Sequence, residues 1–138
     1  MICTSYRLFD LYKLIQPYPS LDILVTSGSL KLEDVASCLQ QLWISYNSIA
    51  SLDGLASLTN LTTLYCSNNL IKSFAELDKL KANEQLRDVL FIGNPMYSEV
   101  GSREEARIEI LRHLPNLKKI DGEFVKISGK SWQFDYFI

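Results

Sequence analysis

The chain has 138 residues with 14 basic and 16 acidic side chains, and its formal net charge of −2 lacks the basic excess that nucleic-acid binding requires. No stretch approaches the roughly 18 consecutive apolar residues of a membrane-spanning helix, and charged residues at positions 7, 10 and 13 interrupt any signal-peptide run. The three cysteines suggest neither a metal site nor a disulfide framework, which favours a reducing, cytoplasmic setting. We therefore expect one domain, residues 1–138, with neither nucleic acid nor membrane as a partner.

The first 38 residues predict an atypical beginning to the fold. Apolar residues at three- and four-residue spacing predict a short amphipathic helix within residues 1–20, which Pro17 and Pro19 end. The face of this helix would consist of Leu8, Leu11, Tyr12 and Ile15. Residues 21–24 then resemble a shortened opening of the repeat that follows, with Thr26 where that repeat has an apolar side chain. Residues 1–38 would form a degenerate repeat, which is either a terminal cap or the remnant of repeats lost upstream.

A nine-residue pattern begins at Leu39 (LQQLWISYN) and recurs at Leu61 (LTTLYCSNN) and Leu86 (LRDVLFIGN). Each copy has apolar residues at its first, fourth and sixth positions and asparagine at its ninth. The asparagines, which are 22 and 25 residues apart, are Asn47, Asn69 and Asn94. This spacing is typical of leucine-rich repeats, in which each repeat supplies one short strand and one helical or irregular return. The sequence thus predicts an α/β solenoid with core repeats at residues 39–94, a short parallel sheet on one face, and helical or 3₁₀ returns on the other.

Alternation within each copy predicts which side chains point into the solenoid. Successive residues of a strand lie on opposite faces, so the fourth and sixth positions point inward and the third, fifth and seventh point outward. The outward set is Gln41, Trp43, Ser45, Thr63, Tyr65, Ser67, Asp88, Leu90 and Ile92. Each asparagine lies where the strand turns, and a carboxamide there can hydrogen-bond the backbone of successive coils. We expect the three asparagines to form a structural ladder.

The outward positions predict a protein-binding surface. Parallel strands would set Trp43, Tyr65 and Leu90 in one row, about 4.8 Å apart per step, with Ile92 beside it. Serine, threonine and aspartate flank this row. An exposed apolar patch rimmed by polar groups marks an interaction site, and Trp and Tyr are frequent hot spots. The alternative is that the C-terminal tail covers the row.

Residues 95–126 predict a C-terminal cap. Ser102 followed by acidic residues matches a helix start, Pro115 matches its end, and a half-strand and turn would follow at residues 117–122. The apolar face of the helix would consist of Ile108, Leu111 and Leu114. The tail, residues 127–138, is rich in aromatic side chains, and we expect it to fold back onto the body as a strand or staple. The alternative is a peptide that docks on a partner.

The sequence offers no enzyme site. The single histidine, His113, has no nucleophile motif nearby, and neither a glycine-rich phosphate loop nor metal-binding spacing occurs. A paired-carboxylate site would have to come from Glu104, Glu105 and Glu109, which are surface positions on a charged helix. We therefore expect no catalytic residue, no cofactor and no metal.

Four strings together resemble the leucine-rich-repeat light chains of axonemal outer-arm dynein. They are LWISYN at residues 42–47, LYCSNN at residues 64–69, GNPM at residues 93–96 and RHLPNLKKIDG at residues 112–122. The resemblance covers residues 39–125. Asn-Pro caps occur in many leucine-rich proteins, whereas LWISYN followed 22 residues later by LYCSNN is much more specific.

The resemblance implies a non-catalytic subunit that binds a dynein heavy chain near its microtubule-binding stalk and helps regulate ciliary beating. It implies tubulin as a further partner, and a location in the cytoplasm and the axonemal cytoskeleton of a cilium or flagellum. Members of the family carry more complete repeats before LWISYN and a charged C-terminus, so contacts made through those parts are not expected here. The alternative is a leucine-rich-repeat regulatory scaffold for another partner, such as a protein phosphatase.

Overall fold

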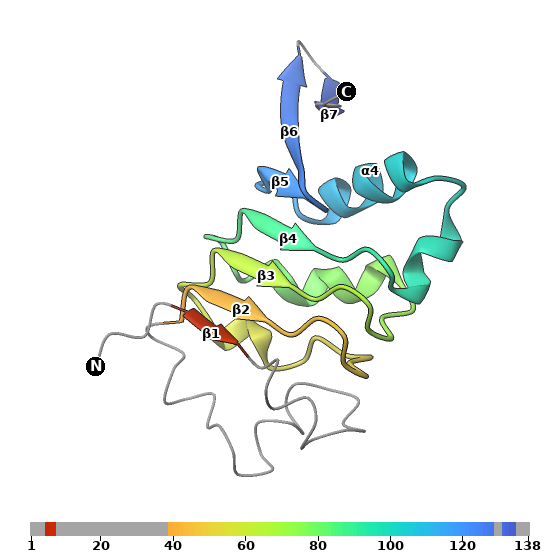
Figure 1. The fold of residues 1–138 in the computed structure, drawn as a ribbon. Coiled ribbons are helices and arrows are strands. Elements are labelled where there is room, and N and C mark those ends of the chain that lie inside the picture. Colours follow the sequence, from red (N-terminus) through yellow and green to blue (C-terminus); the bar gives the residue numbers. More distant parts are fainter. Residues whose placement is uncertain (1–4, 8–38, 129–130, 135–138) are drawn as a thin grey trace.

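The computed structural model describes residues 5–7, 39–128 and 131–134, which form a stack of short strands backed by helical turns (Figure 1). The shortened repeat predicted at residues 21–24, and most of the helix predicted within residues 1–20, lie outside the described residues. The strands are β1 (Ser5–Arg7), β2 (Gln41–Trp43), β3 (Thr63–Tyr65), β4 (Asp88–Leu90), β5 (Lys119–Ile120), β6 (Glu123–Ser128) and β7 (Ser131–Phe134). The helices are η2 (Leu55–Ser57), η3 (Phe74–Leu80), η4 (Pro95–Glu99) and α4 (Arg103–His113).

The strands lie side by side in chain order, from β1 to β7. Strands β1 to β5 pair in parallel, and β6 and β7 pair antiparallel. Parallel neighbours need a crossover between them, and the 3₁₀ helices η2 and η3 lie in those returns behind the sheet (Figure 1). The apolar residues of the two returns recur every three positions, which suits 3₁₀ helical turns, and all of these residues are buried. These residues are Ile49, Leu52, Leu55 and Leu58, then Ile71, Phe74, Leu77 and Leu80.

Each central strand buries one residue between two half-exposed ones. Leu42, Leu64 and Val89 are the buried centres, and they lie directly opposite one another in the register. The sixth position of each repeat is also buried, and burial raises the pKa of the Cys66 thiol to about 12. Cys66 therefore stays a neutral, small hydrophobic side chain of the core.

The asparagine side chains hydrogen-bond the backbone groups that the strands leave behind at the turn. Asn69 Oδ1 accepts from Asn47 N and Ile49 N at 3.1 Å each, and its Nδ2 donates to Ile44 O at 3.0 Å. In the next coil, Asn94 Nδ2 donates to Cys66 O at 2.9 Å, and its Oδ1 accepts from Ile71 N at 3.2 Å. One buried carboxamide thus joins each coil to the coil before it.

The amphipathic helix predicted for residues 1–20 is wrong at Ser5–Arg7, which form strand β1. This strand pairs in parallel with β2, and Tyr6 lies opposite Leu42. The edge of β2 would otherwise present unpaired N–H and C=O groups, so pairing with a strand satisfies groups that a helix would leave open.

Helix α4 has the predicted ends but a different buried face. Ser102 Oγ accepts from Glu105 N at 3.2 Å, which is an N-cap hydrogen bond. Ile108, assigned to the apolar face, is 41% exposed, whereas Arg107 is 1% exposed. The buried face consists of Ala106, Arg107, Ile110 and Leu111. Arg107 is tolerated in the interior because its Nη2 lies 2.9 Å from Glu123 Oε1 of β6, so the buried charge is paired.

The direction of the strands reverses after β5, at a two-residue turn of Asp121 and Gly122. Both residues have positive φ, 50° and 82°, as a tight hairpin turn requires. The Asp121 carboxylate accepts hydrogen bonds from Phe91 N at 2.7 Å and from the Tyr97 hydroxyl. The turn therefore fastens the last coil to the helical cap.

The described part of the tail lies in a hairpin: residues 127 and 128 end strand β6, and residues 131–134 form its second strand. Residues 131–134 pair antiparallel with β6, and the hairpin projects beyond β5, away from β2 (Figure 1). A strand thus forms at residues 131–134 as predicted, but it pairs with β6 and not with a strand of the core repeats, and it lies at the opposite end of the strand order from β2. Residues 135–138 lie outside the described part. Among the residues that the structure describes, no helix combines the length and apolar character needed to cross a membrane.

We expect Leu64→Ala to lower the free energy of unfolding by about 2–5 kcal/mol, because the fully buried side chain would leave a cavity between two coils. Urea titration followed by circular dichroism measures the loss. Thr63→Ala on the same strand is the control, and we expect it to change stability by less than about 0.5 kcal/mol. A loss below that value for Leu64→Ala would contradict the assigned register.

Candidate functional site

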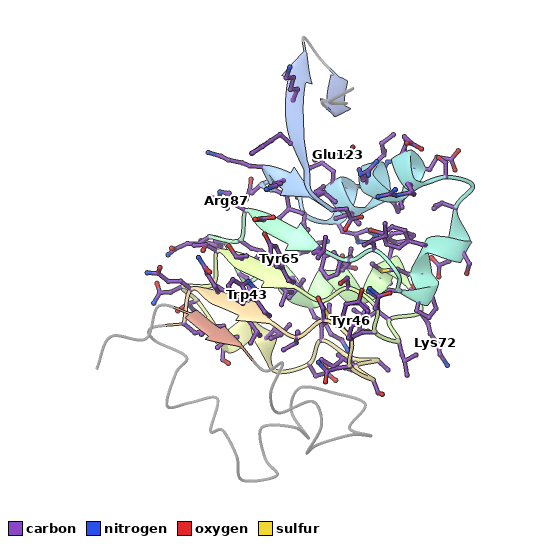
Figure 2. The ribbon with its side chains drawn as sticks, in the orientation of Figure 1. Trp43, Tyr46, Tyr65, Lys72, Arg87 and Glu123 are labelled. Carbon is purple, nitrogen blue, oxygen red and sulfur yellow. The ribbon has the colours of Figure 1, made fainter. Side chains whose placement is uncertain are left out.

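The candidate site is the strand face, by which we mean the solvent side of β2, β3 and β4. It consists of two rows, Gln41–Thr63–Asp88 and Trp43–Tyr65–Leu90, and the residues of each row lie directly opposite one another in the register. All six side chains are half-exposed. Figure 2 shows Trp43 and Tyr65 on neighbouring strands of this face. The short parallel strands therefore bring together side chains that are 22 and 25 residues apart in the sequence.

The two aromatic rings of the face support one another. The ring centroids of Trp43 and Tyr65 are 6.2 Å apart, and their planes differ by 16°, so the rings are stacked. The Tyr65 hydroxyl donates a hydrogen bond of 2.9 Å to Asp88 Oδ2. Burial and the Asp88 carboxylate both raise the pKa of Tyr65, so the phenol stays protonated and keeps donating. A partner would meet aromatic side chains already held in place, which lowers the entropy lost on binding.

The seventh position of the second repeat departs from the predicted surface. Ser67 is 3% exposed, so the prediction that it contacts a partner is wrong. Its Oγ donates to Ser45 Oγ at 2.9 Å, and its N–H donates to the same oxygen at 3.0 Å, which places both hydroxyls in a local network at the ends of β2 and β3. Ser45 and Ile92 are half-exposed and border the strand face.

The eighth position holds an exposed aromatic residue that our sequence reasoning did not include. Tyr46 is 59% exposed and has a φ of 58°, in the left-handed region that costs most residues roughly 1–2 kcal/mol. The same position holds Asn68 in the next repeat and Gly93 in the one after, both of which are residue types that adopt positive φ readily. A Cβ on Gly93 would lie 2.3 Å from Asn68 Oδ1, so the Asn68 side chain would have to move, and the φ of 85° itself disfavours any side chain at this position. Aligning the three repeats would have revealed Tyr46 as the exception.

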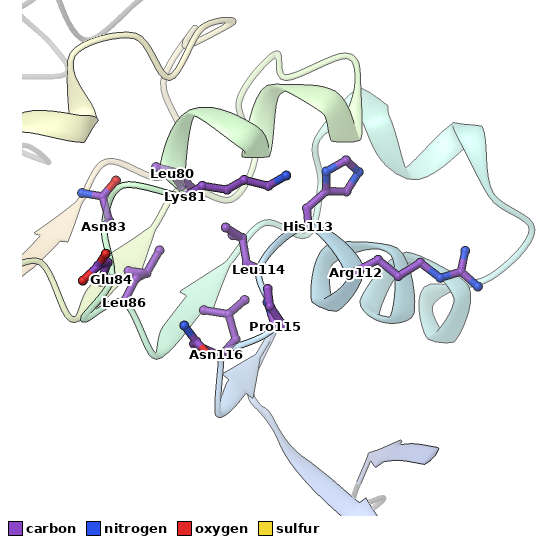
Figure 3. Close-up of a pocket in the computed structure, with 11 residues that line it drawn as sticks. Leu80, Lys81, Asn83, Glu84, Leu86, Arg112, His113, Leu114, Pro115 and Asn116 are labelled. Carbon is purple, nitrogen blue, oxygen red and sulfur yellow. The ribbon is translucent and has the colours of Figure 1, made fainter. Parts of the chain in front are cut away.

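A groove of about 350 Å³ lies behind the sheet, between the end of η3 and the end of α4 (Figure 3). Its charged groups are engaged with one another: His113 Nδ1 lies 2.7 Å from Asp78 Oδ1, Lys81 Nζ lies 3.0 Å from the same oxygen, and Arg112 pairs with Glu109 at 2.9 Å. The contact between His113 and Asp78 fastens α4 to η3, whereas the other two pairs lie within one helical segment each. His113 is therefore a packing residue of the cap, and Glu109 is an ion-pair partner.

The carboxylates considered for catalysis do not converge. Glu105 Oε2 accepts from Gly101 N at 2.9 Å near the start of α4, and Glu104 lies 3.8 Å from Arg107 on the next turn. Within residues 5–7, 39–128 and 131–134, no group of three or more His, Cys, Asp or Glu side chains is arranged to hold a metal ion.

Comparisons with known proteins agree with this geometry. A family model described as Leucine Rich repeats (2 copies) matches residues 39–79. The chain is 52% identical over 102 residues to Dynein axonemal light chain 1 of Chlamydomonas reinhardtii, covering 72% of this chain and 52% of that protein. It is 34% identical over 100 residues to Cilia- and flagella-associated protein 410 of Homo sapiens, covering 69% of this chain and 38% of that protein. The chain thus spans about half the length of the first relative and less of the second.

A solved structure supports the fold alone. The structure titled as the Drosophila melanogaster SNF/U2A′ complex contains a chain that matches with a TM-score of 0.56 at 21% identity, over 64% of this chain and 49% of that one. The predicted α/β leucine-rich-repeat solenoid is therefore confirmed.

We expect Tyr46→Asn to raise the free energy of unfolding by about 1 kcal/mol, because asparagine tolerates the left-handed conformation that tyrosine adopts under strain. Thermal unfolding of the two proteins side by side measures the difference. Asn68→Ala is the matched change in the next repeat, and we expect it to destabilise. A loss of stability in Tyr46→Asn would show instead that the tyrosine ring contributes packing.

Proposed function

Because the chain is a leucine-rich-repeat protein related in sequence to an axonemal dynein light chain, we propose that it is a non-catalytic light chain that binds an axonemal dynein heavy chain. Binding takes place through the strand face, near the microtubule-binding stalk of the heavy chain, and helps to regulate ciliary or flagellar motility. Tubulin in the microtubule wall is a second partner within reach of a subunit held at that stalk.

The observation that carries this proposal is the Trp43–Tyr65–Leu90 row. Three large apolar side chains lie half-exposed on adjacent strands, and the two aromatic rings are stacked. Tyr65 is further held by Asp88. A rigid row of Trp and Tyr within a polar rim is the composition of a binding hot spot.

The relatives point to the place of action. Their names put one in axonemal dynein and the other in cilia and flagella, which are assemblies of the cytoskeleton. This favours the dynein heavy chain over a protein phosphatase as the partner of the strand face. The same face would serve either partner, so the choice between the two partners rests on sequence similarity, and the composition of the surface supports the proposed mode of binding.

The fold suits the attachment of a partner to one rigid body. The core repeats share one continuous buried interior, and buried asparagines link each coil to the one before. A partner bound to the row therefore contacts three strands of one rigid body. Such a subunit acts by holding the stalk in a set orientation, which requires no chemistry of its own.

We expect Trp43→Ala to weaken binding of the heavy-chain stalk by about thirtyfold, since losing a hot-spot aromatic residue costs about 2 kcal/mol or more. Stability should change by no more than about 1 kcal/mol, because the indole is half-exposed. Calorimetry with the isolated stalk and melting curves measure the two effects.

Ile108→Ala, which removes a side chain 41% exposed on α4, is the control and should leave affinity unchanged. Tyr65→Ala should weaken binding as well, and the double variant should lose less than the sum because the rings are in contact. Unchanged affinity in both single variants would show that the strand face is not the binding site.

A further inference from the structure

Three cations gather at the amino ends of β4 and β5, beside the strand face. This basic cluster consists of Arg87, Lys118 and Lys119. The N–H groups of Lys118 and Lys119 donate to Arg87 O at 2.8 and 3.0 Å, so the backbones of the three residues are adjacent. Lys119 also lies opposite Asp88 in the register, in the same row as Gln41 and Thr63. Figure 2 shows Arg87 at the amino end of β4, on the other side of the view from Lys72.

Within the part of the chain that the structure describes, no carboxylate forms a salt bridge with the basic cluster. Elsewhere in the described chain most cations are paired: Lys79 lies 2.8 Å from Asp53, Lys81 lies 3.0 Å from Asp78, and Arg112 and Arg107 bind glutamates. Among the described residues, none of the three cations of the basic cluster forms a salt bridge.

The hydrogen bonds of Arg87 do not offset its positive charge, because their acceptors are uncharged. Arg87 Nη1 donates to the carbonyl oxygens of Glu84 and Leu86, which carry no charge. The nearby Asp88 carboxylate accepts a hydrogen bond from the neutral Tyr65 hydroxyl and keeps its single negative charge, which is smaller than the three positive charges beside it. In a chain with a net charge of −2, this edge of the strand face is a local region of positive charge.

Apolar surface continues next to this charge. The Phe124 side chain is 50% exposed, and Lys119 Nζ lies 5.1 Å from the centre of its ring. On the other side of Asp88, Leu90 continues the row toward Tyr65 and Trp43. The surface thus combines apolar side chains with three cations that form no salt bridge within the described residues.

We propose that the strand face and the basic cluster together bind an acidic, amphipathic segment of the protein partner. Its carboxylates contact Arg87, Lys118 and Lys119, and its apolar side chains contact the aromatic row and Phe124. This inference rests on the proposed function in that the strand face is the docking surface. Charge at the rim of an interface steers the partner to the site and sets its orientation. A nucleic acid is disfavoured, because three cations next to an apolar row give a short electrostatic footprint.

The test uses fluorescence anisotropy with a labelled peptide of repeated Glu-Glu-Leu units. A peptide in which lysine replaces glutamate and a single-stranded DNA of equal length serve as comparison probes. We expect the full chain to bind the glutamate peptide in preference to both, with an affinity that falls several-fold between about 50 and about 200 mM salt. The double variant Lys118→Glu/Lys119→Glu should bind it about tenfold more weakly.

The matched control is Lys72→Glu/Arg103→Glu, which changes the net charge equally at exposed positions outside the basic cluster. Its affinity should stay within about twofold of the wild type. Equal binding of the glutamate and lysine peptides, or wild-type affinity in the cluster variant, would overturn the inference. Preferential binding of the DNA would overturn it as well and would assign the cluster to nucleic acid.

The two proposals fail in different ways. If Trp43→Ala abolishes binding of the heavy-chain stalk while Lys118→Glu/Lys119→Glu binds stalk and peptide normally, the acidic-segment inference is wrong and the proposed function stands. If the chain does not bind the stalk but binds the glutamate peptide through Lys118 and Lys119, the proposed partner is wrong and the acidic-segment inference stands.

Discussion

The rest of the structure depends on the hydrogen bonds of the buried asparagines. Where a strand ends inside a solenoid, its N–H and C=O groups have no ladder partner, and each group left unpaired in the interior costs about 1–3 kcal/mol. Asn69 satisfies such groups in its own coil and in the preceding one. Because the carboxamide spans two coils, it fixes how far one coil lies from the next and in which register. The alignment of Trp43 with Tyr65 and Leu90 follows from that register.

The repeats could be predicted from sequence because their signals are local. Spacing within nine residues distinguished inward from outward positions, and the three copies gave the order of the rows. The buried side of α4 could not be predicted in this way. Arg107 lies inside because Glu123, a residue on another element, supplies the opposite charge. Periodicity assigned Ile108 to the core, since a count of apolar residues along one helix contains no information about a distant carboxylate. Strand β1 was missed for a similar reason, as it is defined by the edge of β2.

In the candidate surface, too, some features follow from local sequence signals and others depend on residues of a neighbouring coil. Trp43 and Tyr65 were predicted by alternation, whereas the loss of Ser67 from the surface depends on a hydroxyl of the neighbouring coil. Tyr46 emerges only when the repeats are compared with one another, and the basic cluster emerges only from the pairing of β4 with β5, which brings Lys118 and Lys119 beside Arg87. A strained aromatic residue and a set of cations without salt bridges contribute little to the fold, and the cations lie beside the strand face on which a partner would bind.

The reversal of strand direction at Asp121 and Gly122 also limits how such a protein can evolve in size. A coil added beyond β5 would need a parallel edge to pair with, and the antiparallel β6 occupies that edge. Repeats can be duplicated only before the cap, where the ion pair between Arg107 and Glu123 would remain unaltered. Each duplication there would lengthen both rows of the strand face by one residue. The area available to a partner would thus increase with the number of repeats. Homologues of different length would differ in the size of the binding surface while keeping the same C-terminal cap.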